Sequence, residues 1–188
     1  MSKKVLIVDT CLACVWMKVP EMEVAGPDDD RWDYDRVNAK IESEIAEGTL
    51  LVLPLASIIE TGNHITQIKG RDRMSFVVEF GKKIQQSIDG DSPWAAFSSQ
   101  NALWEGNHLR DVIGRWMSMN ETGKHSLGDV SILDVATAYR SAGFQVEILT
   151  ADALLKSYEG VDLQQIDMPA PPRRRKKGVT SKSPCLNY

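Results

Sequence analysis

The sequence predicts an α/β protein with a mainly parallel central sheet. Apolar stretches lie within 4–9, 49–53 and 144–149. The continuous apolar runs of the first two are typical of strands buried on both faces of a parallel sheet. Between them, apolar residues repeat at helical spacing. Strands that alternate with helices favour parallel strands joined by right-handed crossovers.

The first half of the chain is expected to hold two strands and three helices. Pro20 ends the first helix, and Pro54 marks the start of the third. In the second helix, Val37, Ile41 and Ile45 repeat every four residues and give one apolar face. The expected elements are strand 4–9, helix 10–19, helix 33–47, strand 49–53 and helix 55–69.

The second half is expected to be mostly helical. Phe76, Phe80, Ile84 and Ile88 share a four-residue spacing, which indicates a helix with one apolar face. Gly143 ends a later helix. The expected elements are helix 72–88, an unassigned segment 94–107, helix 107–119, helix 127–142, strand 144–149, helix 151–158 and an edge strand at 161–166.

Length and charge favour one domain followed by a tail. A chain of 188 residues suits a single domain. We place the domain at 1–168 and the tail at 169–188, where six positive residues, no acid and many Pro and Ser predict disorder. The net charge of −4 makes the body acidic. An acidic body with a basic tail is compatible with a metal site and a nucleic-acid partner.

The composition also predicts the cellular compartment and the state of the cysteines. No apolar run is long enough for a membrane span and the N-terminus does not read as a signal peptide, so a cytoplasmic protein without a membrane partner is expected. Three cysteines argue against a disulfide framework. Cys11 and Cys14 form a C-x-x-C, which we interpret as small buried residues on the first helix. A redox pair and a zinc site remain the alternatives.

Four acids are expected at one edge of the sheet. Asp9 ends the first strand, Glu60 lies about one turn into the helix after the second, Asp129 opens a helix, and Asp152 follows the last long strand. Crowded carboxylates repel one another, and Mg²⁺ or Mn²⁺ would relieve that repulsion because both ions prefer oxygen ligands. Such a site suits hydrolysis of a phosphodiester. Asp134 competes with Asp129 as the third acid, but it lies roughly 140° around the helix from Asp129.

Four segments carry a family resemblance. VLIVDT, LPLASIIETGNHI, SLGDVSILDVATA and ILTADALL, taken in this order over about residues 4–158, resemble the PIN domain. The resemblance implies a three-layer α/β/α sandwich with a mainly parallel sheet. Most members of known activity are metal-dependent ribonucleases, and some are toxins of toxin–antitoxin pairs.

Carried over to this chain, the resemblance makes Asp9, Glu60, Asp129 and Asp152 both the catalytic residues and the ligands of Mg²⁺ or Mn²⁺. It implies an endoribonuclease with RNA as substrate, and it gives Thr10 and Thr150 hydrogen bonds to a ligand or a water. The resemblance also allows for a cognate inhibitor or another partner protein, and for a homodimer. The chain is longer than the compact toxins of this family, and we place the extra material as a helical insertion around 70–125.

Other functions stay open at this point. A non-catalytic PIN-like module that binds RNA or protein would share the fold without cleaving. A receiver-type phosphoacceptor domain is disfavoured because Asp9 is followed by Thr10 rather than a second acid and no central Asp ends a third strand. A small DNA nuclease and a metal phosphatase complete the alternatives.

Overall fold

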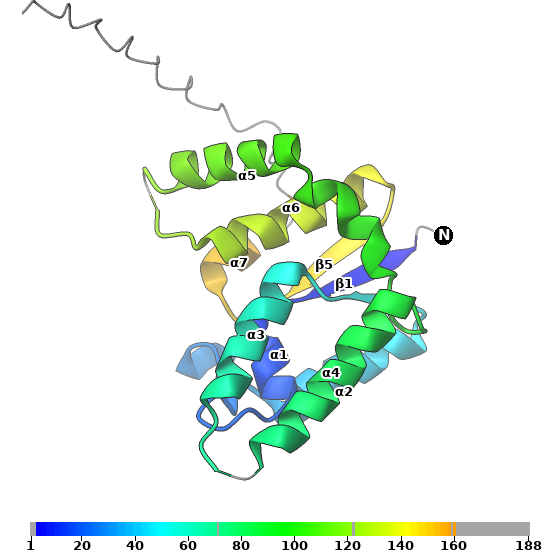
Figure 1. Cartoon of the computed structure of the whole chain (residues 1–188), viewed down its shortest axis with the longest axis vertical. Coiled ribbons are helices and arrows are strands. Elements are labelled where there is room, and N and C mark those ends of the chain that lie inside the picture. Colours follow the sequence, from blue (N-terminus) through cyan, green and yellow to red (C-terminus); the bar gives the residue numbers. More distant parts are fainter. Residues whose placement is uncertain (1–2, 71, 122, 159, 161–188) are drawn as a thin grey trace, which may run out of the picture.

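The computed structural model describes residues 3–70, 72–121, 123–158 and 160, and Figure 1 shows the arrangement of its elements. The strands are β1 (Lys4–Val8), β2 (Val24–Ala25), β3 (Trp32–Asp33), β4 (Leu50–Val52) and β5 (Gln145–Leu149). The α-helices are α1 (Thr10–Trp16), α2 (Tyr34–Ala46), α3 (Leu55–Gln67), α4 (Arg73–Asp89), α5 (Gly106–Met119), α6 (Leu127–Ser141) and α7 (Ala153–Ser157). Two 3₁₀ helices are η1 (Asp28–Asp30) and η2 (Phe97–Trp104). The expected edge strand at 161–166 and the basic tail at 169–188 lie outside the described residues.

The main sheet has three parallel strands in the order β4-β1-β5. The four residues Val5–Val8 of the central strand have no solvent exposure. This confirms the prediction of a mixed α/β chain with a parallel sheet whose first strand is buried on both faces. Because all three strands point the same way, their carboxyl ends meet at one edge of the sheet.

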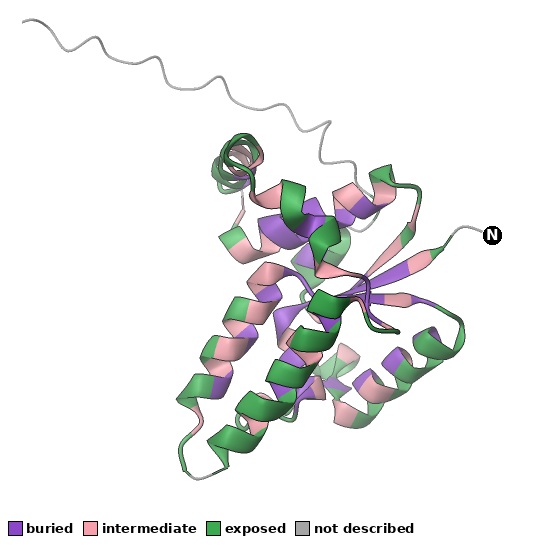
Figure 2. Ribbon diagram, turned by 45° about the vertical axis from the view of Figure 1, so that its right-hand side comes forward, coloured by how far each residue is buried: buried purple, intermediate pink, exposed green. Residues whose placement is uncertain are grey.

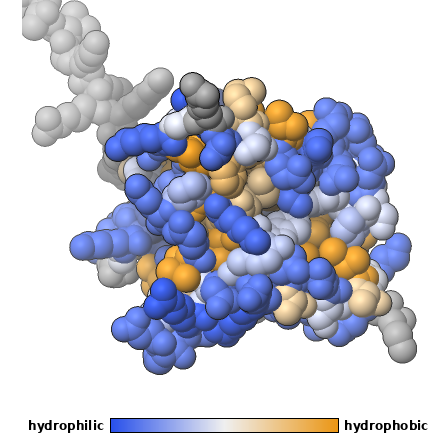
Figure 3. Space-filling view, turned by 90° about the horizontal axis from the view of Figure 1, so that it is seen from below, coloured by the Kyte–Doolittle hydropathy of each residue, from blue (hydrophilic) through white to orange (hydrophobic). Residues whose placement is uncertain are grey.

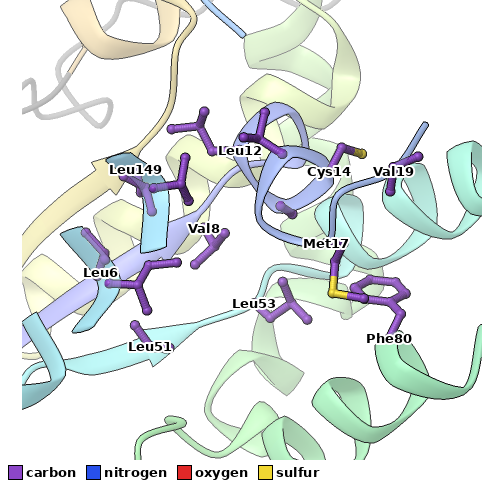
Figure 4. Close-up of a cluster of buried hydrophobic side chains, with 14 of the residues drawn as sticks. Leu6, Val8, Leu12, Cys14, Met17, Val19, Leu51, Leu53, Phe80 and Leu149 are labelled. Carbon is purple, nitrogen blue, oxygen red and sulfur yellow. The ribbon is translucent and has the colours of Figure 1, made fainter. Parts of the chain in front are cut away.

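Alternate strand residues belong to two separate hydrophobic cores. One face contributes Leu6, Val8, Leu51, Leu53 and Leu149, and the close-up in Figure 4 shows this group gathered with side chains of α1 and with Phe80 of α4. The other face contributes Val5, Ile7, Val52 and Ile148, which pack with residues of α6. Strands with a period of two therefore place apolar side chains on both faces, and both faces are covered by helices.

Different helices pack on the two faces of the sheet. Helix α6 packs on β1 and β5, whereas α1 packs against α2 and α3. Figure 2 shows buried residues concentrated on the strands and on the helix faces turned toward them, while the outer faces of α2 and α4 are exposed. The four-residue spacing predicted these apolar faces correctly for Val37 and Ile41 of α2 and for Phe80 of α4, which are buried. The prediction was wrong for the last member of each set, because Ile45 is 38% exposed and Ile88 is 51% exposed.

Part of the segment expected as an insertion is joined to the sheet. Leu51 donates its N–H to the Pro93 carbonyl at 2.8 Å and accepts from the N–H of Ala95 at 2.8 Å. Trp94 forms a parallel bridge with Leu51 and is only 4% exposed. The stretch around Trp94 therefore extends the β4 edge of the sheet, although the sequence left it unassigned.

Two local features differ from the sequence expectation. Helix α1 ends at Trp16 rather than near residue 19, because Lys18 adopts a positive φ of 54° and Val19 donates back to the carbonyl of Cys14 at 3.0 Å. The prediction used Pro20 as the end of the helix and missed the earlier C-terminal turn. Strands β2 and β3 form a two-residue antiparallel ladder that is too short to show periodicity in the sequence.

The outer surface is mixed in polarity. The view in Figure 3 shows mainly hydrophilic residues with hydrophobic side chains scattered between them. Over the part of the chain that the structure describes, none of the helices is both long enough and apolar enough to cross a membrane.

Candidate active site

Asp9 stands at the centre of the carboxyl edge of the sheet. It directly follows β1 and is the N-cap of α1, where its Oδ1 accepts from the N–H of Thr10 at 2.6 Å. The residue is only 6% exposed. A short polar residue between a buried strand and a helix is a typical N-cap, so local sequence alone positions this carboxylate.

The second oxygen of Asp9 is held by two side chains. Oδ2 accepts from the hydroxyl of Thr150 at 2.7 Å and from the thiol of Cys11 at 3.1 Å. Burial raises the pKa of Asp9 above its usual value, and the hydrogen bonds from Thr150, Cys11 and Thr10 only partly oppose this. The negative charge of Asp129 also raises the pKa of Asp9, as the smallest of these effects.

Glu60 reaches the same edge from α3. Its Oε2 accepts a hydrogen bond of 2.9 Å from the hydroxyl of Thr10, the residue after Asp9. Its Oε1 lies against Gly128 near the start of α6, where a Cβ atom would come within 2.4 Å of that oxygen. Glu60 therefore sits between α1 and the first turn of α6, and it depends on the absence of a side chain at Gly128.

Asp129 lies in the first turn of α6 as the sequence predicted. It forms a capping box with Ser126: Oδ2 accepts from the N–H of Ser126 at 2.8 Å, and the Ser126 hydroxyl accepts from the N–H of Asp129 at 2.9 Å. The capping box fixes the carboxylate near the helix N-terminus, next to the glycine that contacts Glu60.

Asp152 is joined to the group through its backbone. Its side chain is exposed and caps α7, accepting from the N–H groups of Leu154 at 2.7 Å and Leu155 at 3.1 Å. Its own N–H donates to the Thr150 hydroxyl at 3.0 Å, and that hydroxyl donates to Asp9. The structure thus links Asp152 to Asp9 through Thr150.

Asp134 has a different environment from Asp129. It is 5% exposed and forms ion pairs with His108 and Arg115 of α5. The two acids of α6 therefore have different neighbours: Asp129 is bonded to Ser126 and its charge acts on Asp9, whereas Asp134 fastens α6 to α5. This geometry favours Asp129 as the third acid.

The donor chemistry of the group fits a hard divalent cation. All four acids offer oxygen ligands, which Mg²⁺ and Mn²⁺ prefer. Among the described residues, no Lys, Arg or His forms an ion pair with Asp9, Glu60, Asp129 or Asp152. The same residues contain no set of three or more His, Cys, Asp or Glu side chains already arranged to hold one metal ion. Hydrogen bonds through Thr10 and Thr150 link Asp9 with Glu60 and Asp152, whereas Asp129 is bonded to Ser126. Over the described ranges of the chain, these carboxylates are neutralised by no basic side chain and their oxygens accept hydrogen bonds.

An open apolar cleft adjoins the acids. It has a volume of about 340 Å³, and it lies between α3, α5 and α6. Glu60 and Gly128 line both the cleft and the carboxylate group, while Ile59, Ile113 and Leu127 line it with about half of their surface exposed. A substrate at the acids would therefore meet an apolar wall beside them.

Four contributors to the site were missed or given other roles from the sequence. Thr10 and Thr150 were expected to bind a ligand or water, whereas they donate to Glu60 and Asp9. Cys11 was interpreted as a small buried helix residue, with a redox pair or a zinc site as alternatives, although its place two residues after an N-cap Asp puts it in reach of the capping carboxylate. Gly128 carried no sequence signal, because its role is to leave space for the Glu60 side chain of another helix, α3.

The two cysteines of the C-x-x-C do not have the environment of reactive thiolates. Burial, reinforced by the charge of Asp9, raises the pKa of Cys11 to about 12, and burial raises the pKa of Cys14 to about 11. Both thiols are therefore protonated at neutral pH, which disfavours the redox alternative.

Comparison with known proteins gives no relative for this chain: no family model, curated protein or solved structure matches it. The functional argument therefore depends on the geometry of the site.

Proposed function

We propose that this chain is a divalent-metal-dependent endoribonuclease of the PIN type. One observation carries the proposal. Buried Asp9 lies at the centre of the carboxyl edge of a parallel sheet, within electrostatic range of Asp129 and joined through Thr10 to Glu60, with no basic partner among the described residues. Acids gathered in this way at the ligand-binding edge of a parallel sheet are suited to holding a cation.

The fold proposed with this function is a three-layer α/β/α sandwich. It is supported by the two hydrophobic cores on opposite faces of the sheet, one with α1 and the other with α6. A parallel sheet covered on both faces presents its ligand-binding residues in the loops after the strands. Asp9 and Asp152 follow β1 and β5 in such loops.

In this proposal, Asp9, Glu60, Asp129 and Asp152 hold Mg²⁺ or Mn²⁺. The bound cation would lower the pKa of a water molecule and neutralise charge that develops on the phosphate. The chain's own residues orient the ligands: Thr10 holds Glu60, Thr150 holds Asp9, and Ser126 holds Asp129. The proposed substrate is RNA, to which the basic tail would add electrostatic affinity.

The test compares the wild type with Asp9→Asn on labelled structured RNA, single-stranded RNA and single-stranded DNA. Each reaction contains Mn²⁺, Mg²⁺ or EDTA. We expect cleavage of RNA by the wild type with metal, none with EDTA, and about a hundredfold less by the variant, because the charged carboxylate ligand is replaced by a neutral amide. Equal cleavage by both proteins would assign the activity to a contaminant and overturn the proposal.

A non-catalytic PIN-like module is the second candidate. It is favoured by the capping role of three of the acids, since Asp9, Asp129 and Asp152 each accept backbone hydrogen bonds at a helix start. This candidate predicts RNA or protein binding that neither EDTA nor Asp9→Asn changes. A gel-shift experiment with the same RNAs and the same two proteins separates it from the nuclease.

A further inference from the structure

Two side chains hold the same oxygen of Asp9. The Thr150 hydroxyl and the Cys11 thiol both donate to Oδ2, at 2.7 Å and 3.1 Å. They approach from different segments, since Cys11 lies in α1 and Thr150 follows β5. Together with the Thr10 N–H on Oδ1, they fill three of the about four acceptor positions of a carboxylate.

The same two side chains also hold the loop that leads to Asp152. The Cys11 sulfur accepts from the N–H of Ala151 at 3.4 Å, and the Thr150 hydroxyl accepts from the N–H of Asp152 at 3.0 Å. Each side chain therefore contacts the Asp9 carboxylate on one side and the β5–α7 loop on the other. A change at either one would alter the position of two of the proposed ligands at once.

We propose that Cys11 and Thr150 form a positioning pair that holds the Asp9 carboxylate and the loop of Asp152 in a fixed relation. The inference rests on the proposed function, because fixing these two acids matters most if both hold one cation. It adds two residues to the site that act through Asp9 and Asp152. Partners that orient a ligand typically change metal affinity about 10–100-fold when they are lost.

The first measurement is the S–H stretching band of Cys11, recorded by infrared spectroscopy in a Cys14→Ala, Cys185→Ala background. We expect a band at lower wavenumber than that of an unbonded thiol, because the thiol donates to a carboxylate. In Asp9→Asn the band should move toward the unbonded position, since a neutral amide is a weaker acceptor. A band at the unbonded position in the parent protein would overturn the proposal.

The second measurement is Mn²⁺ affinity, determined by calorimetry without RNA. We expect Cys11→Ala and Thr150→Val to bind Mn²⁺ about tenfold more weakly. Cys11→Ser and Thr150→Ser keep a donor and should recover most of the affinity. Cys14→Ala removes the same thiol three residues along α1, where no hydrogen bond reaches Asp9, and should bind as the wild type does.

Failure of this inference and of the proposed function give different results. If Cys11→Ala binds Mn²⁺ as tightly as Cys14→Ala does, the positioning pair is wrong while the metal site stands. If the wild type neither binds Mn²⁺ nor cleaves RNA, the proposed function is wrong. A shifted S–H band in that inactive protein would still support the hydrogen bond between Cys11 and Asp9.

Discussion

Asp9 accepts three hydrogen bonds and still has a raised pKa, because burial disfavours the charged carboxylate more strongly than the three donors favour it. The nearby charge of Asp129 acts in the same direction. A residue in this state gains from any additional positive charge. The physical chemistry of one side chain therefore supports the proposal of a bound cation.

Adding a single Cβ atom at Gly128 should disturb the proposed site. In Gly128→Ala, the new Cβ would meet Oε1 of Glu60 at 2.4 Å, so the Glu60 carboxylate must move away from the start of α6. We expect about a tenfold loss of cleavage and of Mn²⁺ affinity. The measurements are kcat/KM on RNA and calorimetric titration with Mn²⁺.

The control for this prediction is Gly62→Ala in α3. A Cβ at Gly62 meets nothing within 4 Å, so it leaves the acids in place. Replacing a helical glycine by alanine stabilises by about 0.5–1 kcal/mol, and Gly62→Ala should show this gain with unchanged cleavage. Equal activity of the two alanine variants would show that the position of Glu60 next to Gly128 does not affect cleavage.

At the scale of single elements, α6 carries two acidic residues with different roles, one in the proposed site and one in the packing of the fold. Its first turn presents Asp129 to the acids, and its middle presents Asp134 to α5. The five-residue spacing puts the two side chains on different sides of the helix. The rotation of one helix thus decides which carboxylate takes part in the chemistry.

Asp129→Asn and Asp134→Asn should therefore have opposite effects. Asp134→Asn leaves Arg115 and His108 without their buried partner and should lower the free energy of unfolding by about 3 kcal/mol. Its kcat at a temperature where the variant is folded should match the wild type. Asp129→Asn should lose cleavage but less than about 1 kcal/mol of stability, because the amide oxygen of Asn can still accept the N–H of Ser126. The reverse pattern would make Asp134 the third acid.

Helix α2 is fastened to the sheet by a buried carboxylate. Glu44 is 5% exposed, and it accepts from Lys4 of β1 and from Lys40, each at 2.6 Å, and from the Thr49 hydroxyl at 2.7 Å. Burial alone would raise the pKa of Glu44. The hydrogen bonds from Lys4, Lys40 and Thr49 outweigh it and lower the pKa from 4.5 to about 2.

This depressed pKa predicts how stability depends on pH. The contribution of Glu44 is fully present above pH 4.5, the ordinary pKa of the group, and is lost as the pH falls toward about 2. It amounts to roughly 3 kcal/mol. Glu44→Gln should lower the unfolding free energy at pH 7, and its difference from the wild type should shrink between pH 4.5 and 2. Denaturant titrations at several pH values measure this.

The exposed Glu47 at the end of the same helix provides the control. Glu47→Gln changes the same chemical group at a position without such partners and should stay within about 0.5 kcal/mol of the wild type. A pH-independent difference between Glu44→Gln and the wild type would contradict the role assigned to Glu44.

At the scale of the whole molecule, the parallel sheet brings acidic residues from distant parts of the chain to one edge. Asp9, Glu60, Asp129 and Asp152 come from four loops or helices, and only the parallel order β4-β1-β5 brings their segments to one edge. Repulsion between Asp9 and Asp129 opposes folding, whereas a cation that binds only the folded state favours it. The stability of the whole fold should therefore respond to metal.

Added Mn²⁺ should raise the melting temperature of the wild type. At a concentration about 100 times its Kd, a ligand specific for the folded state stabilises by about 2.7 kcal/mol. EDTA should reverse the shift, and Asp9→Asn should show little of it. Calorimetric melting curves with and without Mn²⁺ test this. An equal shift in wild type and variant would place the binding elsewhere on the protein.

Sequence alone determined the α/β class, the parallel strands and most helix bounds, because continuous apolar runs and four-residue repeats are local signals. It also placed Asp9 and Asp129 at helix starts, where capping chemistry is local. The tertiary structure decided the contacts of Glu60 with Thr10 and Gly128 and the hydrogen bond from Cys11 to Asp9. It also put Asp134 against α5. Such pairings depend on how elements pack across the sheet edge, which no local pattern of residues encodes.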